Sequence, residues 1–167
     1  QLPIAPTVPE VDKGQSDFNA SKLVELLRAF AEPKVLTVLV LRGSFAPVHS
    51  GHLEALELAK ATVEANGAAV VFGFLALRDQ TQVVQKLQGS TTLLLESSHR
   101  LALCEAACAD SPWLDVLPEV GESRQSTEVV RQQLSTEFRH IEWNVMDVLG
   151  GDYVESHLQI LPQREYA

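Results

Sequence analysis

Residues 35–60 place a buried strand, a glycine-containing loop and an amphipathic helix in direct succession. The opening run, VLTVLVL, is almost continuous in Val and Leu, which predicts a strand buried on both faces. From Gly51 or His52 onward the apolar residues change to helical spacing, which predicts a helix with one apolar face. The residues on this face are Leu53, Leu56, Ala59 and Val63. This order of elements predicts an anion site, because unpaired N–H groups at a helix N-terminus attract phosphate.

The loop also carries two histidines at a spacing that suits an anion. His49 and His52 are separated only by Ser50 and Gly51, and a residue as small as glycine lets a phosphate approach the backbone. Both rings can then face one anion, since a histidine donates from a ring nitrogen and can carry positive charge near neutral pH. His49 and His52 are therefore the candidate catalytic residues.

The rest of the sequence alternates apolar strands with amphipathic helices, which predicts an α/β fold with a parallel sheet covered on both faces. An earlier helix carries the apolar stripe Leu23, Leu26, Leu27 and Phe30. The later elements expected are strands at 68–77, 113–117, 141–149 and 158–161, and helices near 83–87, at 97–109 and from Ser126. In such sheets ligands collect at carboxyl ends of strands where the strand order reverses. The histidine loop and residues 150–152 are thus expected to meet at one site.

Composition fits a globular domain and disfavours some partners. The chain has 167 residues, 46% of them hydrophobic, which suits one domain at 17–167 after a Pro-rich extended arm or linker at 1–16. A net charge of −9 disfavours nonspecific binding to nucleic acid or to an anionic membrane. No apolar run approaches the roughly 18 residues of a membrane span, and residues 1–15 lack a secretory h-region. An intracellular protein is expected, with its compartment and any homo-oligomer or assembly partner left open.

Two cysteines stand four residues apart, which places them on one face of the helix expected at 97–109. Cys104 and Cys108 therefore predict core packing in a reducing compartment. Zinc binding with His99 is the alternative, and it would need further ligands that the sequence does not supply. No metal site on the protein is expected.

The loop resembles a known family. Residues 43–52, GSFAPVHSGH, resemble the G-[ST]-F-x-P-x-H-x-G-H signature of the nucleotidylyltransferases, with Gly, Phe and Pro at the expected offsets. The signature follows a strand and precedes a helix, which is the context that a true match requires. The resemblance implies a Rossmann-like doubly wound parallel sheet, here expected to be incomplete at its C-terminal end.

Three later stretches are similar to nicotinamide mononucleotide adenylyltransferases of eukaryotic type. His99-Arg100, a helix and SPWLDV at 111–116 resemble the HR, helix, S-x-W-[VL]-x-V order of those enzymes. Residues 147–152, DVLGGD, resemble their strand ending in G-[AS]-D, and residues 73–79 more loosely resemble G-x-[LI]-S-P-x-x-D. The resemblance implies adenylyl transfer from ATP, bound with Mg²⁺, to nicotinamide or nicotinate mononucleotide, with release of pyrophosphate.

The resemblance also implies roles for single residues. His49 and His52 would contact the ATP phosphates and the reaction centre, and Asp152 the ribose or adenosine side of ATP, with a simple turn residue as the alternative for Asp152. Glu122 and Thr127 resemble the segment that lines the nicotinamide pocket. The remaining nucleotide-binding positions are Gly43, Ser44, Phe45, Gly51 and Gly150. The pair His99-Arg100 either orients a helix or contacts substrate, and the sequence does not separate these interpretations.

Parts of the family pattern have no counterpart in this sequence. The second phosphate motif, ISSTxxR, has no match up to Ala167, and the lysine usual after Asp79 and the tryptophan usual near Glu122 are absent. Three interpretations stay open: a portion of a longer active adenylyltransferase, an inactive member that serves as a binding or assembly module, or transfer to another phosphate acceptor such as phosphopantetheine. Without the second motif, we expect little activity from these 167 residues alone.

Overall fold

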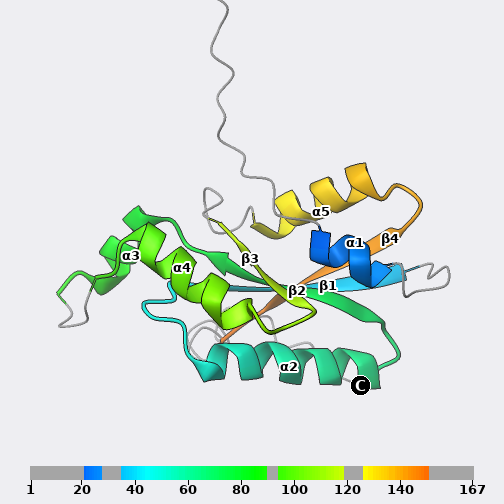
Figure 1. The fold of residues 1–167 in the computed structure, drawn as a ribbon, viewed down its shortest axis with the longest axis horizontal. Coiled ribbons are helices and arrows are strands. Elements are labelled where there is room, and N and C mark those ends of the chain that lie inside the picture. Colours follow the sequence, from blue (N-terminus) through cyan, green and yellow to red (C-terminus); the bar gives the residue numbers. More distant parts are fainter. Residues whose placement is uncertain (1–20, 28–34, 90–93, 119–125, 151–167) are drawn as a thin grey trace, which may run out of the picture.

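The computed structural model describes residues 21–27, 35–89, 94–118 and 126–150. Its centre is a four-stranded sheet in the order β3-β2-β1-β4 (Figure 1). Every neighbouring pair of strands in this sheet is parallel. The strands are β1 (Val35–Gly43), β2 (Val70–Leu77), β3 (Leu114–Leu117) and β4 (Glu142–Val148). These pairings confirm the predicted parallel sheet. Successive strands are joined by helical crossovers, as parallel pairing requires.

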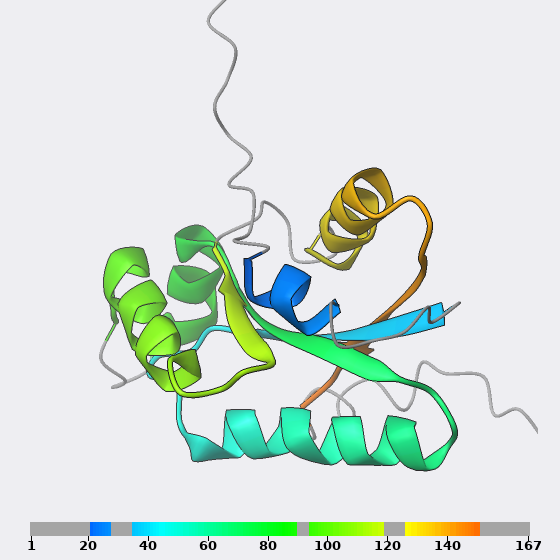
Figure 2. The ribbon, with the colours of Figure 1, turned by 45° about the vertical axis from the view of Figure 1, so that its right-hand side comes forward.

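Helices cover both faces of this sheet, as Figure 2 shows. They are α1 (Ser21–Leu27), α2 (Ser50–Ala65), α3 (Gln80–Leu87), α4 (Ser97–Cys108) and α5 (Ser126–Glu137). Residues of α1 and α5 pack in one apolar cluster with the sheet, and residues of α2 and α4 pack in a second. The fold is therefore the expected doubly wound α/β sheet. No helix in the described ranges is long and apolar enough to cross a membrane.

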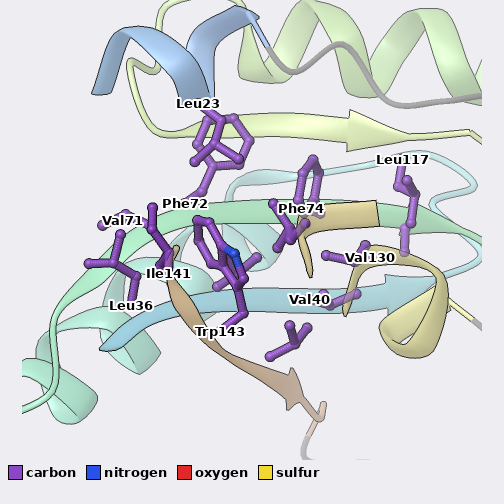
Figure 3. Packing of buried hydrophobic residues seen from close by; sticks show 14 residues of the cluster. Leu23, Leu36, Val40, Val71, Phe72, Phe74, Leu117, Val130, Ile141 and Trp143 are labelled. Carbon is purple, nitrogen blue, oxygen red and sulfur yellow. The ribbon is translucent and has the colours of Figure 1, made fainter. Parts of the chain in front are cut away.

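The first cluster lies between the sheet and helices α1 and α5 (Figure 3). Leu23 of α1 is fully buried there, as are Val130 and Leu134 on one face of α5, the helix predicted from Ser126. Phe72 and Phe74 project from β2 into the cluster with ring centroids 5.0 Å apart. Successive residues of a strand point to opposite faces of the sheet. The strand residues next to those of the first cluster therefore face the second cluster.

The second cluster joins the sheet to α2 and α4. It takes Leu39 and Leu41 from β1, which confirms that this strand is buried on both faces, and the buried Leu56 from α2. Cys104 and Cys108 of α4 are buried there as free thiols, as predicted for core packing. Burial raises the pKa of Cys104 to about 12 and that of Cys108 to about 11, so both stay protonated at neutral pH.

Several element boundaries differ from those predicted. Helix α2 begins at Ser50 rather than at Gly51 or His52, and the short helix expected near 83–87 begins at Gln80. Its first turn is polar and gives no apolar rhythm, but Asp79 acts as its N-cap by accepting a hydrogen bond from Gln82 N at 3.0 Å. The arm at 1–16, Phe30 and the strand expected at 158–161 lie outside the described residues.

Trp113 fixes one end of the second cluster against β2. Its Nε1 donates to Glu57 Oε1 at 2.9 Å, and Lys60 Nζ stands 4.4 Å from the ring centroid. The ring lies over Gly73, where an added Cβ would stand 2.7 Å from Trp113 Cζ3 and 2.8 Å from Leu114 Cδ2. These contacts hold the indole in place, so it cannot easily yield to a larger residue at 73.

Gly73→Ala is therefore expected to lower the free energy of unfolding by about 1 to 3 kcal/mol, the usual cost of overpacking a filled core. Urea unfolding of the two proteins measures this difference. The exposed helical substitution Ser135→Ala is the control, with an expected change within about 0.5 kcal/mol. An unchanged unfolding midpoint for Gly73→Ala would show that the indole is not held in place.

Candidate functional site

The strand order reverses between β1 and β4. The chain passes from β1 to β2 to β3 in one direction, and β4 then pairs with the other side of β1. Leu41 pairs with Val148, so the loop after β1 and the residues after β4 leave the sheet at the same edge. The histidine loop and Gly150 thus lie at one edge of the sheet, and their meeting at one nucleotide site stays a prediction. Asp152 and Glu122 lie outside the described residues.

The first part of the loop has an unusual backbone. Phe45 has φ +44°, in the left-handed region, and the residue is only 2% exposed. Such a conformation costs a non-glycine residue about 1 to 2 kcal/mol, so surrounding contacts must hold it. The ring packs on Gly43, where an added Cβ would stand 2.6 Å from Phe45 Cε1. Gly43 is thus needed for the position of the Phe45 ring.

The two histidines are brought together at the start of α2. His49 is its N-cap residue, and its backbone N donates to His52 Nδ1 at 3.1 Å. The ring centroids are 3.8 Å apart, and the edge of Phe45 meets the His52 ring at a centroid distance of 5.0 Å. Since Nδ1 of His52 accepts a hydrogen bond, the proton of its neutral imidazole belongs on Nε2. His52 is therefore set up as an Nε2–H donor.

Gly51 completes this arrangement between the histidines. A Cβ at Gly51 would stand 3.2 Å from Cε1 and Nδ1 of His49, which is closer than most real contacts. A larger residue would press on the His49 ring, so a small residue here leaves that ring in its place beside His52. The predicted nucleotide-binding residue Gly43 ends β1, and Ser44 and Phe45 precede the histidines in the loop that follows.

Burial, and secondarily the charge of His49, lower the pKa of His52 below its ordinary 6.5. The folded chain thus binds this proton less readily than the unfolded chain. Stability from this group is complete above about pH 6.5 and is lost as pH falls through the lower pKa of the folded state.

We expect the free energy of unfolding to fall more between about pH 8 and about pH 5 in the wild type than in His52→Asn. Asparagine does not titrate, and its side-chain oxygen can accept the same bond from His49 N. Urea unfolding at both pH values measures the two differences. An equal pH dependence in both proteins would contradict the lowered pKa of His52.

A second polar group lies at this edge of the sheet, on the α5 face. Thr127 is buried at the start of α5, and its hydroxyl donates to Asp147 Oδ1 at 2.6 Å. Arg42 Nε stands 3.3 Å from the same oxygen. These contacts tie β1, β4 and α5 together. The role of Thr127 at a mononucleotide pocket stays a prediction. In the structure its hydroxyl donates its hydrogen bond to Asp147.

Arg100 reaches the loop from α4. It is fully buried, and its Nη1 donates to Ser44 O at 2.9 Å and to Arg78 O at 3.0 Å. Its Nη2 donates to Gln80 Oε1 at 3.0 Å. His99 is exposed on the same helix. Of the two interpretations of this pair, Arg100 has the contacts of an orienting residue, and it orients the loop as well as the helix.

The ion pair between Arg42 and Asp147 could not be predicted from the sequence. In the sequence the two residues are only polar positions near the ends of two strands, and their pairing depends on which strands are neighbours. The available signal was an arginine directly before the signature glycine, at the end of an otherwise apolar strand. A charge at that position is costly unless it is paired, which points to a partner at the same edge.

Comparison with known proteins agrees with this geometry. The cytidylyltransferase-like family model matches residues 40–161. A nicotinamide/nicotinic acid mononucleotide adenylyltransferase of Oryza sativa subsp. japonica is 36% identical over 81 residues, 48% of this chain and 30% of that protein. The protein of the same name in Arabidopsis thaliana is 33% identical over 107 residues, 63% of this chain and 42% of that protein. The chain thus spans less than half the length of these curated relatives.

The family match begins within β1 and includes the histidine loop, the contacts of Arg100 and the β1/β4 edge. This edge is the position at which open α/β sheets bind ligands. The strand order, the crossover helices and the matched span lead to one assignment. The chain belongs to the cytidylyltransferase-like family.

Proposed function

We propose that this chain carries the nucleotide-binding loop of an adenylyltransferase that acts on nicotinamide or nicotinate mononucleotide. The observation that carries the proposal is the pair His49 and His52 at the N-terminus of α2, beside the point where the strand order reverses. The names of the two plant relatives support the choice of acceptor. Nucleotidyl transfer is also in keeping with the family.

The chemistry requires alignment and charge stabilisation rather than a protein nucleophile. A phosphate oxygen of the mononucleotide attacks the α-phosphorus of ATP, a new P–O bond forms, and the bond to the bridging oxygen breaks as pyrophosphate leaves. Negative charge shifts toward the leaving group during this step. His52 would donate its Nε2–H to a phosphate oxygen, and the exposed His49 would act beside it.

Backbone groups would complete the anion site. His52 N donates to His49 O at 3.0 Å, whereas the N–H groups of Ser50 and Gly51 make no backbone hydrogen bond within the described ranges. The helix dipole also favours negative charge at this end. Gly43, Ser44, Phe45 and Gly51 would bring the backbone close to the phosphates, and Gly150 would meet the nucleotide from the end of β4. Asp152 retains its proposed contact with the ribose or adenosine side.

Magnesium would enter as part of the Mg–ATP substrate. Mg²⁺ prefers oxygen ligands and is commonly held by substrate phosphates and water, with few protein ligands. In the ranges that the structure describes, no group of three or more His, Cys, Asp or Glu side chains forms a metal cage. The histidines at the loop would contact phosphate oxygens through their ring N–H groups, with the cation carried by the nucleotide.

Pyrophosphate release tests the function. The intact protein is incubated with Mg–ATP and one acceptor at a time: nicotinamide mononucleotide, nicotinate mononucleotide or phosphopantetheine. We expect release with a pyridine mononucleotide and the matching dinucleotide as product. Release with phosphopantetheine alone would assign another acceptor. Mg–ATP binding without release of pyrophosphate would identify a binding module. The absence of both Mg–ATP binding and pyrophosphate release would refute the proposal.

A further inference from the structure

The guanidinium of Arg100 joins three segments at the carboxyl edge of the sheet. It is 0% exposed and donates to Ser44 O at 2.9 Å, to Arg78 O at 3.0 Å and to Gln80 Oε1 at 3.0 Å. Figures 1 and 2 both draw α4 beside the loop from β1 to α2. A buried guanidinium needs hydrogen-bond acceptors, and its planar fork fixes their directions. Arg100 therefore determines where the Ser44 carbonyl points.

The direction of the Ser44 carbonyl determines the direction of the next N–H group. Ser44 C=O and Phe45 N–H belong to one planar peptide unit, which is trans, so the two groups point in opposite directions. With the carbonyl directed at Arg100, Phe45 N–H is directed away from α4. Phe45 is only 2% exposed, and its N–H makes no backbone hydrogen bond within the described ranges. A buried N–H without an acceptor is rare, so this group calls for one.

The same peptide unit is poised to rotate. Phe45 has φ +44°, which a bulky side chain rarely adopts. A flip of the Ser44–Phe45 peptide plane would change ψ of Ser44 and φ of Phe45 together. It would return Phe45 to the negative φ that L-residues prefer and reverse its N–H. The hydrogen bond from Arg100 Nη1 to Ser44 O opposes this flip, and the bond to Arg78 O helps to hold the guanidinium in place.

We propose that Arg100 is a positioning residue of the nucleotide loop: it holds the Ser44–Phe45 peptide so that Phe45 N–H donates to a phosphate oxygen of the bound nucleotide. Arg100 itself touches no ligand and acts through Ser44. This inference rests on the proposed function of the loop for its ligand. The held peptide orientation does not depend on that function and can be measured separately.

The test uses Arg100→Met, which removes every donor, and Arg100→Lys, which keeps the charge but loses the planar fork. Gln80→Met is the matched control, because it disturbs the same buried cluster without touching Ser44. Dissociation constants for Mg–ATP and for Mg–tripolyphosphate are measured by amide NMR in each protein, and urea unfolding gives stability. Without ligand, the NOE between H–N and Hα of Phe45, strong at positive φ, reports the flip.

Arg100→Met is expected to weaken tripolyphosphate binding about tenfold or more and to lose the strong Phe45 NOE. Arg100→Lys is expected to weaken binding less, since an ammonium can still donate to one carbonyl. Gln80→Met should lose stability but bind within about twofold of wild type, as expected when no donor at the loop is removed. If Arg100→Met does not fold, the positioning role is tested by comparing the tripolyphosphate affinity and the Phe45 NOE of Arg100→Lys with those of Gln80→Met.

Two failures remain distinguishable. A strong Phe45 NOE in the Arg100 variants, or phosphate affinity equal to that of wild type, would overturn the positioning role and leave the proposed function intact. A wild-type protein that binds neither Mg–ATP nor tripolyphosphate would refute both the proposed function and the ligand part of this inference. In that case, loss of the strong Phe45 NOE in Arg100→Met would still establish that Arg100 fixes the orientation of the Ser44–Phe45 peptide.

Discussion

In the intact protein, the substitution His52→Asn is expected to lower the rate of nucleotidyl transfer by about 10²- to 10³-fold. Asparagine places an oxygen near the position of Nδ1, so the hydrogen bond from His49 N, 3.1 Å in the wild type, can be kept. It places nothing where Nε2 stands, so the donor aimed at the phosphates is lost. Removing one donor directed at developing charge has this effect in well-studied oxyanion holes.

Pyrophosphate release under saturating Mg–ATP measures the loss, and urea unfolding at about pH 8 checks that the fold is kept. Two further variants serve as controls. His52→Gln places an amide nitrogen near Nε2 but gives up the bond from His49 N, so it should retain more activity than His52→Asn. His140→Asn changes an exposed histidine just before β4, at the opposite edge of the sheet, and should leave activity unchanged. Wild-type turnover in His52→Asn would show that this ring is structural.

Gly43→Ala is expected to weaken Mg–ATP binding about tenfold or more and to lower the free energy of unfolding by about 1 to 3 kcal/mol. The added Cβ would stand 2.6 Å from Cε1 and 2.8 Å from Cζ of Phe45. That ring is buried and its backbone has positive φ, so it can yield only if the loop changes shape. The contact between Phe45 and His52 would change with it.

The matched control for Gly43→Ala is Gly73→Ala, which overpacks the Trp113 contact within the sheet. Both variants should lose stability, but only Gly43→Ala should also lose affinity for Mg–ATP. Isothermal titration calorimetry of the two proteins, with urea unfolding beside it, separates these effects. Equal affinities in both variants would mean that the shape of the loop around Phe45 does not govern nucleotide binding.

Much of the fold was predictable because it depends on local patterns. The apolar run of β1, the stripe of α2 and the loop between them each specify their element within a short window. The alternation of strands and helices then specifies a parallel sheet, and the chain returns to β1 with β4 on its other side. The placement of the histidine loop at the edge of the sheet follows from these features.

The contacts that shape the loop were less predictable, because they join residues far apart in the chain. Arg100 lies 56 positions from Ser44, and nothing local indicates that its guanidinium meets that carbonyl. The positive φ of Phe45 is likewise imposed by surrounding packing rather than by its own residue type. Thr127 was predicted from a resemblance, but its bond to Asp147 depends on the register of β4 beside β1.

Nucleotide binding at the reversal of strand order is tested most directly by amide NMR during a titration with Mg–ATP. We expect the largest shifts at Gly43, Ser44, Phe45, the first turn of α2 and Gly150, all at the carboxyl edge of β1 and β4. Adenosine, which lacks the phosphates, should shift the histidine loop much less. Shifts confined to the opposite edge, around residues 68–69 and 140–142, would contradict a nucleotide site at this loop.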